Sequence, residues 1–262
     1  VGSEMCIRDS LKRGAVGLVG VTAILPFCYL LVTGVWKPSS GFTVQGYYEA
    51  FLASPKYLLR FWKSLGLCLC IVVGQLLVSI FGGFGFAKCR FKGRSFLFFL
   101  LLSIMILPLQ VTLVPNYMVL EGMRLIDTDW ALLLPAIFAP LGTFIMTQSL
   151  KAVPDEMIEA AELDGANVLK TLFYVLVPMS RSGCACVLLL SFMDGWNMVE
   201  QPIAYLKDFE QYPLIVALSY VPPQDNMVQL ACCVMVLLPP LFLFLHFTQE
   251  LAEGIALAGM KG

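Results

Sequence analysis

Charged residues are scarce in this sequence. Only 13% of its 262 residues are Asp, Glu, Lys or Arg, whereas 59% are hydrophobic, and the mean hydropathy is +0.82. A soluble domain of this length carries about twice that share of charge. The composition therefore excludes a soluble globular protein and predicts an integral membrane protein. A net charge of −1 offers no basic face for nucleic acid.

Catalytic and metal-binding patterns are also missing. The sequence has one histidine, and none of the patterns G-x-x-x-x-G-K-[ST], H-E-x-x-H or G-x-S-x-G occurs. The nine cysteines form no C-x-x-C pair and fall mostly inside apolar runs, which is typical of small buried side chains. We expect no catalytic residue, no metal site and no cofactor in this chain.

Long apolar runs dominate what is present. A bilayer core about 30 Å thick needs roughly 20 residues of helix, and six runs approach or exceed that length. They are Gly14–Trp36, Ser64–Ala87, Ser95–Leu120, Trp130–Leu150, Ser182–Ala204 and Asn226–Gln249. Prolines inside several runs predict kinked helices around a cavity. We expect an all-α membrane protein with six transmembrane helices.

The distribution of basic residues predicts the orientation. With the N-terminus inside, most of the 17 Lys and Arg residues face the cytoplasm, above all the cluster Lys88–Arg94 in a short loop. Both termini are then cytoplasmic. So is the loop between the fourth and fifth spans.

That loop, Val153–Pro178, reads VPDEMIEAAELDGANVLKTLFYVLVP and is the most polar stretch between two spans. Pro154 suits the first position of a helix, and Gly165 suits the left-handed residue that ends one. Helical spacing places three acidic residues on one face (Asp155, Glu159 and Glu162) and three apolar residues on another (Met157, Ile158 and Ala161). The pattern predicts a short helix, a tight turn and a second helix.

The same loop resembles a known motif. The order Glu159-Ala160-Ala161, then Gly165, then a Val-Leu-Val-Pro ending at Pro178 is similar to the EAA loop of ABC-importer permeases. The DGA at Asp164–Ala166 is similar to the carbohydrate-uptake branch of that family. Further segments similar to the family's sequences are Leu107–Leu120, Gly195–Asn197 and Gly254–Gly262, so the resemblance covers about residues 14–262.

The resemblance implies a function and partners. The short loop helix would be a coupling helix that docks on an ATPase subunit, with Glu159, Ala160, Ala161, Asp164, Gly165 and Pro178 as coupling residues. The chain would be one permease of a sugar importer in the bacterial inner membrane. Its partners would be a second permease, an ATPase dimer that carries ATP and Mg, an extracytoplasmic solute-binding protein near Tyr205–Asp225, and the lipid bilayer.

Five polar residues within or near the spans are candidates for the translocation path. Asp194 lies about 18 Å into the fifth run, and an ionisable group at that depth points to function or to a partner on a neighbouring helix. The others are Gln110, Asn116, Gln148 and Asn197, which could line the path or bond across helices. In maltose-type relatives the other permease holds most of the sugar, so no ligand contact is assigned to them.

Other interpretations stay open at this stage. The loop helix could lie on the bilayer as an amphipathic connector, although such anchors favour Lys and Arg on their polar face. The chain could carry amino acids, peptides or another small solute, act without an ATPase, or be a membrane enzyme. Residues 1–10 resemble a translated cloning adaptor, so we interpret them as a non-native leader and residues 11–262 as one transmembrane domain.

Overall fold

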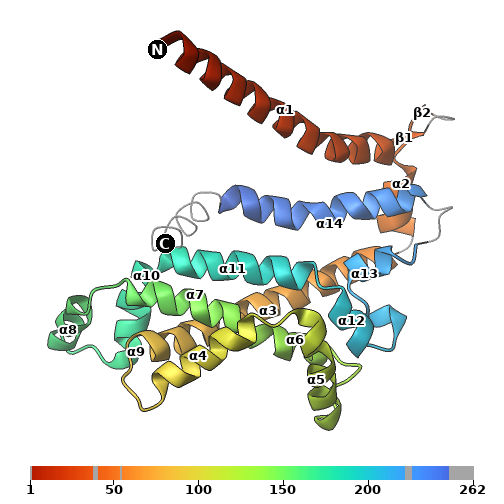
Figure 1. Cartoon of the computed structure of the whole chain (residues 1–262). Coiled ribbons are helices and arrows are strands. Elements are labelled where there is room, and N and C mark those ends of the chain that lie inside the picture. The colour runs from red at the N-terminus through yellow and green to blue at the C-terminus, as the bar shows by residue number, and fades with distance from the viewer. Residues whose placement is uncertain (1, 38–40, 54, 222–225, 248–262) are drawn as a thin grey trace. The chain divides into compact units, whose positions relative to one another are not determined.

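The computed structural model describes residues 2–37, 41–53, 55–221 and 226–247, and nearly all of its regular structure is helical (Figure 1). This confirms the all-α prediction. The described residues fall into two compact units, one within residues 2–59 and 220–238 and the other within residues 60–219 and 239–247. The tail motif Gly254–Gly262 lies outside the described residues.

The first unit joins the N-terminal helix to part of the last one. Its elements are α1 (Gly2–Val35), β1 (Trp36–Lys37), β2 (Gly41–Phe42), α2 (Gln45–Tyr48), the π-helix η1 (Glu49–Ala53) and residues 226–238 of α14 (Asn226–His246). The two strands form a small antiparallel hairpin. Gly46 lies so close to α14 that a Cβ there would be 2.6 Å from the carbonyl oxygen of Met227, so glycine permits this contact.

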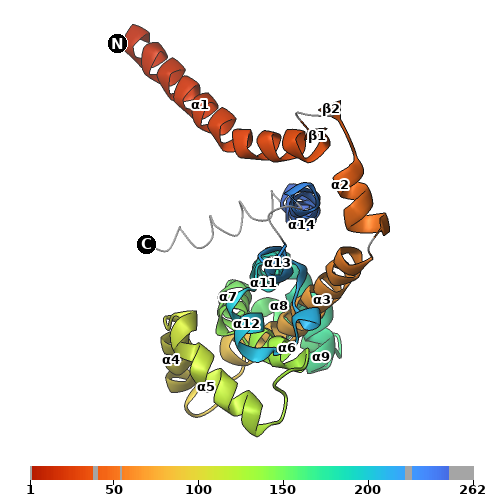
Figure 2. The ribbon, with the colours of Figure 1, turned by 90° about the vertical axis from the view of Figure 1, so that its right-hand side faces the viewer.

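The second unit holds the loop and the cavity described below. It contains most of α3 (Lys56–Ala87) and then, in order, α4 (Arg94–Met105), α5 (Leu109–Gly122), α6 (Trp130–Ile137), α7 (Pro140–Lys151), α8 (Glu156–Leu163), α9 (Val168–Thr171), η2 (Leu172–Leu176), α10 (Val177–Met179), α11 (Arg181–Trp196), α12 (Glu200–Tyr205), η3 (Phe209–Gln211) and α13 (Leu214–Leu218). In Figure 2, α7 and α11 appear nearly end-on as packed neighbours.

The helices pack closely where glycines face them. A Cβ on Gly82 or Gly83 of α3 would meet Thr143 or Met146 of α7 at 2.6–2.9 Å, so the two helices approach nearly backbone to backbone. Small residues allow this contact between membrane helices. An apolar cluster lies at one end of these helices and includes Ile80, Met146, Leu150, Leu172, Leu176 and Val187.

Three described helices are long and apolar enough to cross a bilayer without a sharp bend: Lys56–Ala87, Trp130–Lys151 and Met227–His246. Two further runs consist of bent helix pairs, Arg94–Met105 with Leu109–Gly122 and Val168–Met179 with Arg181–Trp196. In α1 the apolar part is Val19–Val35. The structure thus contains three to five candidate spans by length and composition.

The run expected as one span at Ser95–Leu120 is instead two helices at 109° (Figure 1). The break falls at residues 106–108. Pro108 lacks an amide hydrogen and is extended, with φ −66° and ψ 148°. The chain therefore cannot continue α4 through this point. Similarly, the run at Ser182–Ala204 ends its first helix at Trp196 and resumes at Glu200.

Candidate functional site: the α8 loop and a polar cavity

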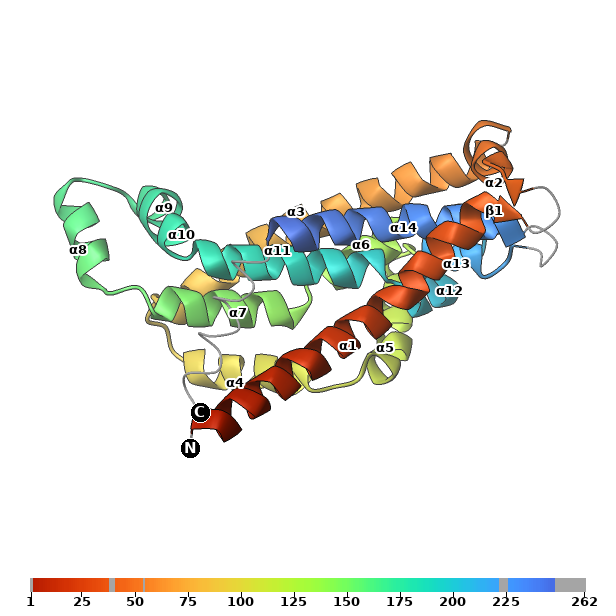
Figure 3. The ribbon, with the colours of Figure 1, turned by 90° about the horizontal axis from the view of Figure 1, so that it is seen from above.

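The loop helix α8 lies at the end of the packed helices α3, α7 and α11 in the view from above (Figure 3). It begins at Glu156, two residues after Pro154, which was expected at the first helical position. Ala161 is buried, and Ile158 packs against the apolar cluster around Leu172 and Leu176. Met157, expected on the same face, is exposed. One side of α8 thus anchors the helix to the rest of the second unit.

The end of α8 has the turn geometry that the sequence predicts. Gly165 has φ +78°, the left-handed conformation that residues with a Cβ rarely adopt. Its N–H donates to the Glu162 carbonyl at 3.0 Å, and the Ala166 N–H donates to the Ala161 carbonyl at 2.9 Å. This pair of bonds is the Schellman motif, which satisfies carbonyls at a helix end. The predicted helix, turn and second helix are confirmed.

The surface of α8 that faces away from the apolar cluster is acidic and partly apolar. Glu159, Ala160, Glu162 and Asp164 are exposed, and Leu163 is 89% exposed. Exposed apolar side chains continue across the turn at Val168, Leu169 and Tyr174. Pro178, expected to close the motif, is exposed within α10. An apolar patch bordered by carboxylates is typical of a surface that another protein covers.

A buried lysine ties the start of α8 to the end of α3. Lys88 Nζ lies 2.6 Å from the Val153 carbonyl oxygen and 2.6 Å from Asp155 Oδ1. The Lys88 side chain is only 9% exposed, whereas Asp155 is 73% exposed. The hydrogen bond from Lys88, then the charges of Lys88 and Arg90, lower the pKa of the Asp155 carboxyl. Asp155 is therefore ionised at neutral pH. Because Lys88 contacts both Val153 and Asp155, the basic loop Lys88–Arg94 lies at the same end of the helices as α8.

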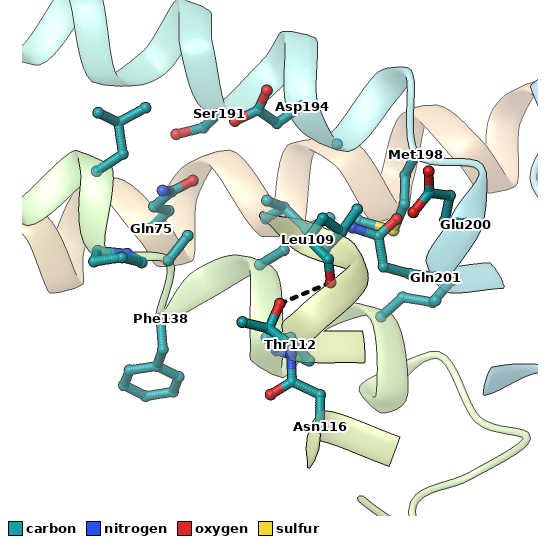
Figure 4. Close-up of a pocket in the computed structure, with 18 of the residues that line it drawn as sticks. Gln75, Leu109, Thr112, Asn116, Phe138, Ser191, Asp194, Met198, Glu200 and Gln201 are labelled. Carbon is teal, nitrogen blue, oxygen red and sulfur yellow. Dashed lines mark hydrogen bonds between the residues drawn. The ribbon is translucent and has the colours of Figure 1, made fainter. Parts of the chain in front are cut away.

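A cavity of about 820 Å³ lies among α3, α5, α6, α11 and α12 within the second unit (Figure 4). Its lining is largely apolar, with polar groups from several helices. These are Gln75 from α3, Thr112 and Asn116 from α5, Ser191 and Asp194 from α11, and Asn197, Glu200 and Gln201 from α12 and the turn before it. Such a mixture, mostly apolar with a few converging polar groups, is typical of small-molecule sites.

The five expected path residues divide around this cavity. Asp194, Asn116 and Asn197 line it. Asp194 lies in the last turn of α11, beside the break before α12, and Asn197 closes that helix by donating to the Met193 carbonyl at 2.9 Å. Gln110 does not line the cavity, but its amide donates to Glu200 Oε1 at 3.1 Å.

Gln148 is exposed on α7 and does not line the cavity. Sequence reasoning does not identify Gln75, Ser191, Glu200 and Gln201 as cavity residues. A single polar residue in such a run gives no signal of which way it faces. The one available signal is that Asp194 and Glu200 are two acidic residues within the same apolar run, Ser182–Ala204.

The segment after α12 folds back onto the start of α3. Arg60 is buried, forms an ion pair with Glu210 at 3.0 Å, and lies 4.4 Å from the centre of the Phe209 ring. Asp127 accepts hydrogen bonds from the backbone amides of Lys207 and Asp208. The part of Tyr205–Asp225 that the structure describes is thus held in a defined conformation.

No group of three or more potential metal ligands occurs among the residues described. The arrangement instead offers an anchored, acidic surface helix and a polar cavity.

Comparison with known proteins gives consistent results. The model of the family described as binding-protein-dependent transport system inner membrane component matches residues 75–249. The arabinooligosaccharides transport system permease protein of Bacillus subtilis is 29% identical over 90% of this chain and 89% of its own length. The sn-glycerol-3-phosphate transport system permease protein of Yersinia pestis is 27% identical over 77% of this chain and 74% of its own length.

A solved structure shares the fold. It is a bacterial ABC transporter involved in the import of the acidic polysaccharide alginate, and one of its chains superposes with a TM-score of 0.82 at 19% identity. The match covers 93% of this chain and 96% of that one.

Proposed function

The chain belongs to the family of binding-protein-dependent transport system inner membrane components, and on that premise we propose that it is a permease subunit of an ATP-driven sugar importer. A permease of this kind is not an enzyme, because a separate subunit hydrolyses the ATP. We further propose that the chain forms half of the translocation pathway beside a second permease. ATP and Mg would be bound by an ATPase dimer, and an extracytoplasmic binding protein would deliver the solute.

The relatives support a sugar or sugar-like solute. One is named for arabinooligosaccharides and another for sn-glycerol-3-phosphate, while the solved structure with the same fold comes from an alginate importer. All three solutes are rich in hydroxyl groups. A permease for amino acids or peptides finds no support in these names.

The observation that carries the proposal is the geometry of α8. The helix is fixed by Ile158 and Ala161 on one face and by Lys88 at its start, yet it exposes Glu159 and Leu163. A connector lying on the bilayer would bury its apolar face in lipid and carry basic residues on the other. The acidic and apolar surface of α8 instead suits a protein partner with basic residues. We propose that this partner is the ATPase, and that Ala160, Asp164, Gly165 and Pro178 shape the docked loop.

Orientation and span number follow in the same proposal. The Lys88–Asp155 ion pair holds the basic loop Lys88–Arg94 beside α8, and a basic loop this short favours the cytoplasmic side. This supports a cytoplasmic α8 and cytoplasmic termini in the bacterial inner membrane. Six spans result if each bent pair crosses once and Val19–Val35 is added to the three continuous helices.

The cavity is proposed as this chain's share of the path. Asp194, Asn116 and Asn197 line it directly, and Gln110 positions Glu200 at its edge. Gln148, which lies outside the cavity, has no part in this proposal.

Purification of the complex tests the function. The tagged chain, extracted from membranes in mild detergent, is expected to bring with it an ATPase and a second, related permease. After reconstitution into liposomes, ATP is expected to drive sugar uptake that depends on the binding protein. A chain that works alone would indicate a secondary transporter and would refute the proposal.

Charge reversal on α8 tests the coupling role. Glu159→Lys is expected to lower uptake by about tenfold or more and to abolish stimulation of the ATPase by the loaded binding protein, because a basic partner surface would repel it. Glu121→Lys, an exposed acidic position at the end of α5, is the matched control and should leave both activities intact. Normal uptake and stimulation in Glu159→Lys would contradict the proposal.

A further inference from the structure

The polar lining of the cavity contains acids and amides but no base. Asp194 and Glu200 bring two carboxyl groups, whereas no Lys, Arg or His is among the residues that line it. Both carboxyl groups belong to exposed residues that face open space in the cavity. Glu200 is held there by the bond from Gln110. An anionic solute would find no opposite charge among these lining residues.

A buried amide also points into the cavity without a partner. The side chain of Gln75 is part of the lining, the residue is only 5% exposed, and it makes no side-chain hydrogen bond among the described residues. Figure 4 shows it on α3, across from Ser191 and Asp194 on α11. A buried amide normally has hydrogen-bond partners, because burying it without them is costly. The group therefore indicates that a polar ligand or water occupies this space.

The chemistry of the lining favours one class of ligand. Hydroxyl groups donate and accept hydrogen bonds, so a saccharide can donate to carboxylates and exchange both kinds of bond with amides. The apolar remainder of the lining, such as Ile71 and Leu132, suits the C–H faces of a sugar ring. A phosphate or uronate group would instead lie beside two carboxylates with no cation in the lining, and the like charges would repel it.

We propose that this cavity is a binding site for a neutral saccharide and that Asp194 and Glu200 exclude solutes carrying phosphate or carboxylate groups. This inference rests on the proposed function and narrows it. The names of the relatives do not make this distinction, because one is named for arabinooligosaccharides and another for sn-glycerol-3-phosphate.

Thiol-modifying reagents of different charge test the site directly. In the assembled complex, Asn197→Cys places a thiol in the cavity, where none of the described native cysteines lies. Its modification is followed by peptide mass spectrometry with three methanethiosulfonates, the neutral 2-hydroxyethyl, the anionic 2-sulfonatoethyl and the cationic 2-trimethylammonioethyl reagent. Each rate is divided by that of the same reagent with a free thiol in solution.

The anionic reagent is expected to react about tenfold more slowly than the neutral one, because the two carboxylates repel it at short range. Adding Asp194→Asn and Glu200→Gln, which preserve the side-chain shape, should bring the two rates within about threefold of each other. As the matched control, Gln148→Cys on the exposed face of α7 should show no such effect of the two substitutions. Co-purification of the ATPase and the second permease verifies that each variant assembles.

Two results would overturn the inference. One is equal rates for the neutral and anionic reagents in the parent complex, and the other is a ratio that the two neutralising substitutions leave unchanged. Uptake assays separate this from the proposed function. If the complex imports arabinotriose but the neutral and anionic reagents react at equal rates, only the proposed charge selection fails. If ATP drives no saccharide uptake at all, the proposed function fails whatever the ratio.

Discussion

Replacing Lys88 with methionine is expected to loosen α8 without unfolding the membrane helices. Methionine retains the apolar stem that packs at the end of α3, but it removes the ammonium group. The Val153 carbonyl and the Asp155 carboxylate then lose their shared donor. The segment between α7 and α8 would be held only by its apolar contacts.

The magnitude follows from the two bonds. A hydrogen bond from a charged donor contributes about 1.5–3 kcal/mol to stability, and here the acceptor is the backbone carbonyl of the buried residue Val153. The pair with Asp155 adds less, because that carboxylate is largely exposed and water screens it. At about 1.4 kcal/mol per tenfold, local opening at the start of α8 should become roughly 10–100-fold more frequent. Transport per ATP hydrolysed should fall, because α8 can move without moving α3.

Hydrogen exchange of the reconstituted complex measures the opening. Backbone amides of the first turn of α8, around Ile158 and Glu159, should exchange faster in Lys88→Met by that factor. Lys92→Met, in the same basic loop but exposed, is the matched control and should match the parent. Asp155→Asn should have a smaller effect, because the bond to Val153 remains. If Lys88→Met exchanged at the parent's rate, Lys88 would not be what positions α8.

Two further substitutions test the turn after α8 and the packing of α3. Gly165→Val should destabilise the turn by about 1–2 kcal/mol, because a β-branched residue is strained at φ +78°, and hydrogen exchange of the α8 amides should become faster. Gly165→Asn is the control, because asparagine tolerates this conformation. Equal exchange in the two variants would contradict the turn assignment. Gly83→Ala should lower the free energy of unfolding of the detergent-solubilised complex by about 1–3 kcal/mol, because its Cβ would lie 2.9 Å from a backbone carbon of α7. Gly85→Ala is the control, because open space surrounds that position. Similar melting temperatures of the two variants would refute the close approach of α3 and α7.

The α8 loop was predictable from sequence because its signals are local. Gly165 marks the helix end through its own backbone preference, and the spacing of Ile158 and Ala161 identifies the buried face. Both follow from residues within a few positions of one another. The start of the helix differs from the prediction by two residues, because Pro154 can stand before a helix as well as at its first position.

The bend between α4 and α5 could not be placed in the same way. Proline occurs inside several apolar runs, and α6 contains Pro135 without ending there. At Pro108 the chain turns by 109°, whereas at Pro115 the helix α5 continues. Hydropathy measures only whether a run is apolar, so it cannot distinguish a kink from a break.

The cavity was harder still, because its members come from helices distant in the sequence. Gln75 is separated from Asp194 by more than a hundred positions, and only the packing of α3 against α11 brings them to the same space. The partnership of Gln110 with Glu200 likewise depends on α5 turning back toward α12. Sequence reasoning could identify polar residues in apolar runs, but not which of them face one another.

The loop and the cavity are nevertheless joined by one continuous element. Helix α11 begins at Arg181, directly after the turn that follows α10, and carries Asp194 in its last turn. Its 16 residues span about 24 Å, and its close packing against α7 favours movement as a rigid body. Between α8 and α11 lie Leu172 and Leu176, which pack in the same apolar cluster as Ile158 of α8 and Val187 of α11, so a displacement of α8 would reach α11 through them. Continuity of this kind becomes coupling only if α8 and α3 move together, and the Lys88 bond is the contact that would require them to do so.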